Sequence, residues 1–237
     1  MRSFERCPGE QRARTTTDWL DSRHSFSYRP HYDPDNTHFG LLLAHNEDLL
    51  QPGPGFTMHR HRDFEILTWV IEGCLEHQDS AGHRELIRPG TVQLLSAGSG
   101  VEHAEFSGAP DRPVHLVQMW LSPDRTGEPP SYSRADLTGE LAGGELVPVA
   151  AGSGQPVLRL RQRDAVLWAA RLPVGDTVAL PSAPYLHLFL ARGSVEVAGA
   201  GLLRAGDALR IIDAAGDRLT ALEPAELLVW SMAASVA

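Results

Sequence analysis

The sequence predicts an all-β fold made of two barrels in tandem. Glycine and proline are frequent, with 22 and 17 residues in a chain of 237. They separate short apolar runs at intervals of roughly 8 to 12 residues, a spacing typical of β-sandwiches and barrels. Long helical periodicity is hard to find, and the pattern of strands and turns returns in the second half. A chain of this length can bury a sizeable core as one large or two small all-β domains.

Each strand expected in the first half is an apolar run bounded by turn residues. The Asp-Ser-Ala-Gly turn at 79–82 joins two of these runs as a hairpin. The expected strands cover residues 39–46, 64–73, 75–79, 83–88, 91–96, 101–107 and 113–121.

A polar stretch rich in proline and glycine, residues 122–145, separates the two halves. It has little to bury, although it has room for a helical turn. We therefore expect an N-terminal domain over residues 1–125, a linker over 126–145 and a C-terminal domain over 146–237.

The two halves share a cadence of turns. In each half an apolar strand ends in glycine, a short polar hairpin follows, and a second turn leads into the next strand. Gly73 and Pro89-Gly90 mark these turns in the first half, and Gly193 and Ala205-Gly206 mark them in the second. This cadence suggests that one barrel has been duplicated within the chain.

Composition excludes several classes of protein. Thirty acidic and 21 basic residues give a formal net charge of -9, which disfavours binding to nucleic acid. No apolar run approaches the roughly 20 residues of a membrane-spanning helix, and the first residues lack a secretory apolar region. Cys7 and Cys74 lie far apart, so neither a disulfide framework nor a cysteine-rich zinc site is expected. We expect a cytoplasmic protein without membrane or nucleic-acid partners.

Two pairs of residues have the spacing of metal ligands on strands. Side chains at i and i+2 point to the same face of a strand, and His59 and His61 have this relation, as do His103 and Glu105. Three neutral imidazoles and one carboxylate would hold a divalent metal and leave about two octahedral positions open for substrate. A closed structural site would not leave that vacancy.

Spacing alone is weak support, because a chain with 11 histidines produces such pairs by chance. His83 and Glu85 have the same spacing, and we expect them on an exposed hairpin arm. Both chosen pairs differ from this one because they adjoin glycine turns and strongly apolar strands.

Four segments of the chain resemble the pirin family of bicupins, which includes bacterial flavonol (quercetin) 2,3-dioxygenases. The resemblance is dense over roughly residues 15–125 and beyond 145 is limited to the strand cadence. It implies two cupin-type (jelly-roll) β-barrels in tandem, with a metal held by His59, His61, His103 and Glu105. The segments are WLDSRHSFSY at 19–28, HYDPDN at 31–36, HRHRDFEILTWVIEGCLEHQDSAG at 59–82 and LLSAGSGVEHAEFS at 94–107.

The oxygen ligand has two candidates. The broader cupin pattern is satisfied by Gly53, His59, His61 and Glu65, which makes Glu65 a rival. The pirin pattern favours Glu105 and leaves Glu65 beside the site.

The remaining residues of interest receive no direct role in the chemistry. Arg60 stands where the family commonly has proline, and strand alternation should turn it away from the metal. His77 and His115 are expected to be surface or cross-strand residues. His187 is the only histidine of the second half, so the C-terminal cupin should lack a metal site.

The resemblance implies a dioxygenase that opens the ring of flavonols such as quercetin with O2 and releases carbon monoxide. Fe2+ is the expected metal, with Mn2+, Ni2+, Co2+ and Cu2+ as alternatives. The metal would lower the pKa of the substrate hydroxyl, and Glu105 would act as ligand or as momentary base.

Two other functions are compatible with the same ligands. One is an iron- or redox-sensing regulator that binds a partner protein and has little or no enzymatic activity. The other is a purely structural bicupin with a vestigial site. The sequence does not separate these functions, and it does not fix the substrate, the metal or the oligomeric state.

Overall fold

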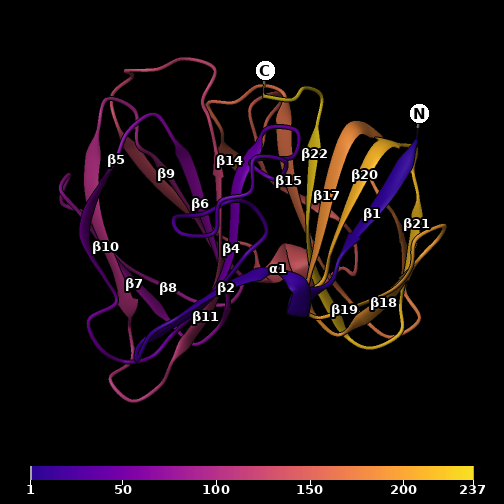
Figure 1. The fold of residues 1–237 in the computed structure, drawn as a ribbon, viewed down its shortest axis with the longest axis horizontal. Coiled ribbons are helices and arrows are strands. Elements are labelled where there is room, and N and C mark those ends of the chain that lie inside the picture. The colour runs from indigo at the N-terminus through magenta and orange to yellow at the C-terminus, as the bar shows by residue number, and fades with distance from the viewer. Residues whose placement is uncertain (1, 237) are drawn as a thin grey trace.

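Two antiparallel β-barrels lie side by side in the computed structural model, which describes residues 2–236 (Figure 1). Each barrel consists of a seven-stranded and a four-stranded sheet. The N-terminal barrel contains β2 (Ala13–Thr16), β3 (Leu20–His24), β4 (Leu42–Leu50), β5 (Phe56–His61), β6 (Glu65–Glu72), β7 (Leu75–Asp79), β8 (Arg84–Ile87), β9 (Thr91–Ser96), β10 (Val101–Ser107), β11 (Val114–Leu121) and β12 (Ser131–Asp136).

The C-terminal barrel is built from the remaining strands. They are β1 (Ser3–Cys7), β13 (Val147–Ala151), β14 (Leu158–Arg159), β15 (Ala165–Leu172), β16 (Thr177–Ala179), β17 (Ala183–Arg192), β18 (Ser194–Val197), β19 (Gly201–Arg204), β20 (Ala208–Ala214), β21 (Arg218–Ala221) and β22 (Ala225–Met232). The helical elements of the described chain are short, η1 (Gly9–Gln11) and α1 (Thr138–Leu141). No helix among residues 2–236 is long and apolar enough to cross a membrane.

The expected strands of the first half are confirmed. β7, β9 and β10 occupy the expected ranges, and β6, β8 and β11 differ by one residue at one or both ends. β4 begins later than expected because the chain turns at Gly40, where φ is +55°. It also runs further, to Leu50, because residues 47–50 pair with β11 on one side and with β3 on the other.

Strand pairing crosses the boundaries that composition suggests. β1 pairs with β20, so the indigo N-terminal strand lies at the edge of the C-terminal barrel (Figure 1). The stretch 126–145, expected as a linker with a helical turn, contains α1 and also β12, which pairs with β9. Both β1 and β12 are edge strands with mostly exposed or half-exposed residues. An edge strand of this kind lacks the apolar run that marks a strand in sequence.

The two barrels share the topology of their central strands, whereas their outer strands differ: β14 pairs parallel with β13, but β2 pairs antiparallel with β3. The seven-stranded sheets have the orders β12-β9-β6-β11-β4-β3-β2 and β1-β20-β17-β22-β15-β13-β14, and the four-stranded sheets β5-β10-β7-β8 and β16-β21-β18-β19. Matching turns carry the same strain: φ is +83° at Gly73 and +77° at Gly193. A Cβ added there would lie 2.4 Å from the carbonyl oxygen of Pro113 or 2.3 Å from that of Pro224. The repeated core topology and the matching turns agree with the predicted duplication of one barrel.

The interiors of the barrels differ. One large apolar cluster spans the seam between the two seven-stranded sheets and includes Trp69 and Trp230. A second continuous cluster fills the C-terminal barrel. The N-terminal barrel holds only two small clusters, one around Leu75 and one around Leu95. Polar residues therefore occupy part of its interior.

Candidate metal centre

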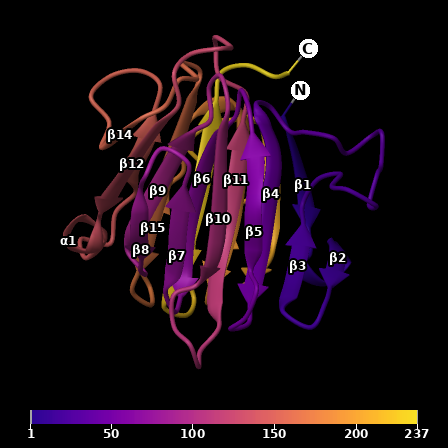
Figure 2. The same cartoon turned by 90° about the vertical axis from the view of Figure 1, so that its left-hand side faces the viewer.

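Three neighbouring strands of the N-terminal four-stranded sheet carry the candidate ligands. β10 lies between β5 and β7, and the three strands run side by side in Figure 2. The register places His103 opposite His59 on one side and Asp79 on the other. Glu105 lies opposite His77, and a bulge interrupts the pairing with β5 between His103 and Glu105. Bulges of this kind re-aim side chains near functional sites.

Three imidazoles predicted as ligands lie together. The ring centroids of His59 and His103 are 4.4 Å apart, those of His59 and His61 are 4.9 Å apart, and those of His61 and His103 are 5.0 Å apart. One nitrogen from each ring falls within 4.8 Å of the others, so this group could hold a metal ion. His61 and His103 are buried, whereas His59 is half-buried at the opening.

A second group of candidate ligands shares His103 with the first. It consists of His77, His103 and Glu105, whose donor atoms also lie within 4.8 Å of one another. His77, predicted to be a surface or cross-strand residue, lies cross-strand from Glu105 and is 0% exposed, so it is not a surface residue. One sign of its inward position is local, the i, i+2 pair His77 and Asp79, which puts both side chains on the inner face of β7.

Glu105 is held by donors from the opposite sheet. Its side chain is 1% exposed. Gln93 Nε2 donates to Oε1 at 2.7 Å, and Gln118 Nε2 donates to Oε2 at 2.6 Å. Burial by itself raises the pKa of Glu105, but His77, His103 and the Gln118 amide together lower it to about 2. The carboxyl group is therefore ionised at neutral pH.

The imidazoles have the lone pairs that a metal needs. His59 Nδ1 donates to the Thr57 carbonyl oxygen at 2.8 Å, which leaves Nε2 free to bind a metal. Burial lowers the pKa of His61 and of His103 to about 4, so both rings are neutral at neutral pH. Within residues 2–236, His61 Nε2 and both nitrogens of His103 are buried without a hydrogen-bond partner. Buried nitrogens are normally paired, and a divalent metal fits these neutral imidazoles and one carboxylate.

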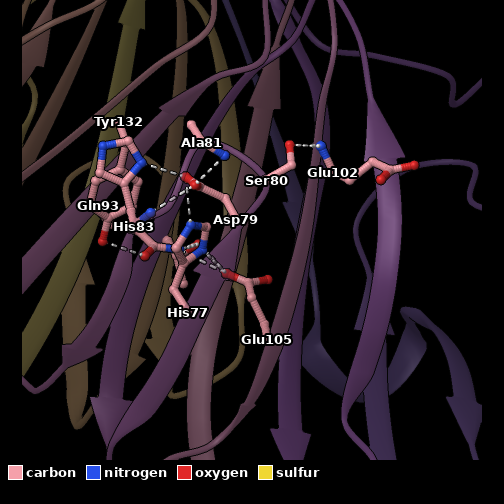
Figure 3. A network of polar contacts seen from close by, with 10 residues as sticks. His77, Asp79, Ser80, Ala81, His83, Gln93, Glu102, Glu105 and Tyr132 are labelled. Atoms are coloured by element: carbon pink, nitrogen blue, oxygen red, sulfur yellow. Dashed lines mark hydrogen bonds and ion pairs between the residues drawn. The ribbon is translucent and has the colours of Figure 1, made fainter.

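A polar network lies beside the centre, on the β7 side of β10 (Figure 3). His77 Nε2 lies 3.4 Å from Asp79 Oδ2, which also accepts from His83 Nδ1 at 2.8 Å. The Tyr132 ring stacks on both imidazoles, with centroids 4.8 Å from His77 and 5.0 Å from His83. Burial lowers the pKa of His77, but Glu105 and Asp79 raise it above its ordinary value. His83, expected on an exposed arm, is part-buried and bonded to Asp79.

Glu65 lies outside both groups of candidate ligands. Its buried carboxylate accepts from Ser96 Oγ at 2.9 Å and from the backbone N–H of Arg161 at 3.1 Å. These bonds connect the first barrel to the segment that enters the second. Arg60 is exposed, as alternation along β5 predicts, and its guanidinium lies against Gly100.

A cavity of about 350 Å³ opens onto His59, His61 and Glu105. Its volume is within the range of about 300 to 1,000 Å³ typical of small-molecule sites. Its wall contains both aromatic and polar residues. The aromatic residues are Trp19, Tyr28, Phe56 and Trp120, and the polar residues include Ser22, Asn46, Asp48 and Gln118.

The C-terminal barrel has apolar residues at the matching positions. Leu219 on β21 lies opposite Val197 on β18, as Glu105 on β10 lies opposite His77 on β7. Both apolar side chains belong to the continuous core of that barrel. Among the described residues, both groups that could hold a metal lie in the N-terminal barrel. His187 is buried in the seam, with its ring centroid 4.8 Å from that of His45.

Two barrels of this topology, one lined by imidazoles and a carboxylate, define a bicupin with a candidate metal centre. Comparison with known proteins identifies the family to which this bicupin belongs. The family model "Pirin" matches residues 8–121, and the model "Quercetinase C-terminal cupin domain" matches residues 149–232. The chain belongs to the pirin family.

Individual relatives agree with this assignment. A Mycobacterium tuberculosis protein named "Putative quercetin 2,3-dioxygenase" is 52% identical over 227 residues, covering 95% of this chain and 93% of the relative. The "Pirin-like protein" of Caulobacter vibrioides is 37% identical over 214 residues, covering 89% and 91%. The crystal structure of the bacterial pirin YhhW from Escherichia coli in complex with nickel(II) superposes with a TM-score of 0.90 at 28% identity, covering 99% of this chain and 100% of YhhW.

Proposed function

We propose that the protein is a mononuclear Fe(II) dioxygenase that opens the ring of flavonols such as quercetin. The observation that carries this proposal is the cavity, which has aromatic and polar walls and ends on His59, His61 and Glu105. A flavonol is a flat aromatic molecule with hydroxyl groups along its edge. Such a molecule matches a pocket whose wall offers both aromatic ring faces and hydrogen-bonding groups.

The protein's own residues would have distinct tasks in this reaction. We assign His59, His61, His103 and Glu105 as the metal ligands. Bound iron would supply a Lewis acid for the substrate hydroxyl and a redox centre for O2. The amides of Gln93 and Gln118 keep the Glu105 carboxylate oriented.

The cavity walls would position the substrate. Trp19 and Phe56 meet edge to face, with ring centroids 5.4 Å apart. The ring centroids of Trp120 and His61 are 4.9 Å apart, and Trp120 Nε1 donates a hydrogen bond to Gln118 Oε1 at 3.0 Å. These rings would hold the flat substrate and keep water from the reacting carbon atoms. Free cysteines are typical of a reducing compartment, and we place the reaction in the cytoplasm.

The names of the relatives support the enzymatic function over a regulatory one. Several are named for quercetin 2,3-dioxygenase activity, including the Mycobacterium tuberculosis relative and an Escherichia coli protein 41% identical over 124 residues, which covers 52% of this chain and 54% of that protein. The bacterial pirin YhhW was crystallised in complex with nickel(II), a divalent ion other than iron. Fe2+ is therefore tested against Mn2+, Ni2+, Co2+ and Cu2+.

The experiment is aerobic incubation of metal-loaded protein with quercetin. We expect loss of flavonol absorbance together with release of carbon monoxide, fastest with Fe2+. The controls are metal-free protein and the His59→Ala, His61→Ala double variant, whose metal content is measured in parallel. Turnover by the fully loaded wild type no faster than by these controls would refute the proposal.

A further inference from the structure

We propose that Asp48, and not Glu105, is the group that accepts the proton of the substrate hydroxyl. This inference rests on the proposed function, because it assigns a step of that reaction. It concerns a residue that sequence spacing does not single out, since Asp48 lies on β4, outside both i, i+2 ligand pairs.

Glu105 already has partners at both oxygens. Gln93 donates a short hydrogen bond to one of them and Gln118 donates one to the other. A bond to a metal would withdraw further electron density from the same oxygens.

Asp48, in contrast, has a carboxyl oxygen without a hydrogen-bond partner in the described chain. It lines the same cavity as His59 and His61. Its side chain is 3% exposed, and its Oδ1 has no hydrogen-bond partner within residues 2–236. A buried carboxyl oxygen without a donor is costly, and a hydroxyl group of a ligand in the cavity would supply that donor. The cavity position thus gives Asp48 the geometry of a general base.

The surroundings of Asp48 favour proton exchange near neutral pH. Burial, with the negative charges of Glu105 on β10 and Glu47 on β4, raises its pKa to about 7. The hydrogen bond from Ser22 on β3 and the guanidinium of Arg12, just before β2, act in the opposite direction. The cavity lining also contains the uncharged side chains of Asn46 and Gln118, the guanidinium of Arg29, and His24, whose pKa is lowered by burial. A general base is most effective when its pKa is close to the working pH.

The proton transfer balances within the reaction. The O–H bond of the substrate hydroxyl breaks, its electron pair stays on the substrate oxygen, and a new O–H bond forms on Asp48. Flavonol and O2 give the ring-opened ester and carbon monoxide without net consumption of protons. Asp48 therefore returns its proton to the product or to water as the product leaves.

The test compares wild type with Asp48→Asn, which keeps the shape of the side chain and removes the base. We expect kcat/KM for quercetin to fall by about 10²- to 10⁴-fold with unchanged metal content. Anaerobic binding gives a second readout, because deprotonated quercetin absorbs at longer wavelength than the neutral form. Wild type should bind the deprotonated form at neutral pH, and D48N the neutral form. The matched control is Asp21→Asn on β3, which lies outside the cavity lining and should behave as wild type.

Infrared spectroscopy separates this inference from the proposed function. The carboxyl stretch that is present in wild type and absent in D48N reports the protonation of Asp48 without any substrate. We expect it to titrate near neutral pH in metal-free protein, and to move to higher pH in Ser22→Ala because that change removes a hydrogen bond that lowers the pKa. An Asp48 that stays ionised down to about pH 4, its ordinary range, overturns the inference even if quercetin is turned over. A protein without flavonol turnover but with this titration refutes only the proposed function.

Discussion

Replacing Gln93 by leucine should weaken metal binding by about 10- to 100-fold. Gln93 Nε2 lies 2.7 Å from Glu105 Oε1, in a fully buried, charge-assisted hydrogen bond. Bonds to charged groups contribute about 1.5 to 3 kcal/mol, and about 1.4 kcal/mol corresponds to a factor of ten in an equilibrium constant. Outer partners of metal ligands contribute a similar factor in other proteins, about 10- to 100-fold. Gln93 does not line the cavity, so the change leaves the substrate walls intact.

The assay is competition for the metal with a chelator of known affinity. The matched control is Gln162→Leu, because Gln162 is also buried but donates to the Ser122 carbonyl oxygen at 3.0 Å, outside the centre. Tyr132→Phe in the Gln93→Leu background removes the hydroxyl that would lose its acceptor, since Tyr132 donates to Gln93 Oε1 at 3.1 Å. Gln93→Leu protein with wild-type affinity, or an equal loss in Gln162→Leu, would show that this bond does not orient the carboxylate.

Three further changes test the seam, the metal and the duplication. His187→Leu should raise the free energy of unfolding in urea by about 1–3 kcal/mol at neutral pH, since both ring nitrogens are buried without a partner in the described chain. A lower free energy of unfolding would contradict this and would indicate that a bound water satisfies the ring nitrogens. Burial and the charges of Arg210 and Arg12 lower the pKa of His187 in the folded protein to about 3, below its unfolded value of 6.5. The neutral buried ring therefore contributes less to stability as the pH falls from about 6.5 towards 3. The stability of His187→Leu should depend less on pH over this range. Removal of the metal with a chelator should lower the melting temperature, since an ion at 100 times its Kd stabilises the folded protein by about 2.7 kcal/mol. Amide hydrogen exchange should become faster in β5, β7 and β10, which carry the candidate ligands, but not in β16, β18 and β21 of the second barrel. Gly73→Ala and Gly193→Ala should destabilise by similar amounts, above about 1 kcal/mol, in thermal melts, because both positions combine positive φ with a close carbonyl oxygen; clearly unequal losses would contradict the matched turns.

Local sequence patterns predicted most of the fold because apolar strands and glycine turns are local features. The runs at 75–79, 91–96 and 101–107 became β7, β9 and β10. β1 and β12 were not predicted as strands, because an edge strand pairs along one side and needs few apolar residues. Their partners, β20 and β9, are set by how the whole chain folds back on itself.

The candidate site was predictable to the extent that its residues form pairs along one strand. His59 with His61, and His103 with Glu105, show the i, i+2 spacing, and the structure brings their strands together. His77 is brought to Glu105 by the register between β7 and β10, which spacing along the chain does not specify. Asp48 gives no local signal, because its importance comes from burial beside a cavity formed by distant strands.

The matching architectures show how the N-terminal barrel accommodates a polar interior. Its imidazoles come from the outer sheet, on β5, β10 and β7, whereas Thr68, Gln93 and Gln118 come from the seven-stranded sheet at the seam (Figure 1). The seam sheet is packed against its counterpart through one continuous apolar cluster. Glu105, which lies on the outer sheet, is thus hydrogen-bonded to the sheet that contributes to this large apolar cluster. The C-terminal barrel has Leu219 at this position and needs no such bonds, so its second sheet contributes apolar core while that of the first barrel contributes candidate metal ligands.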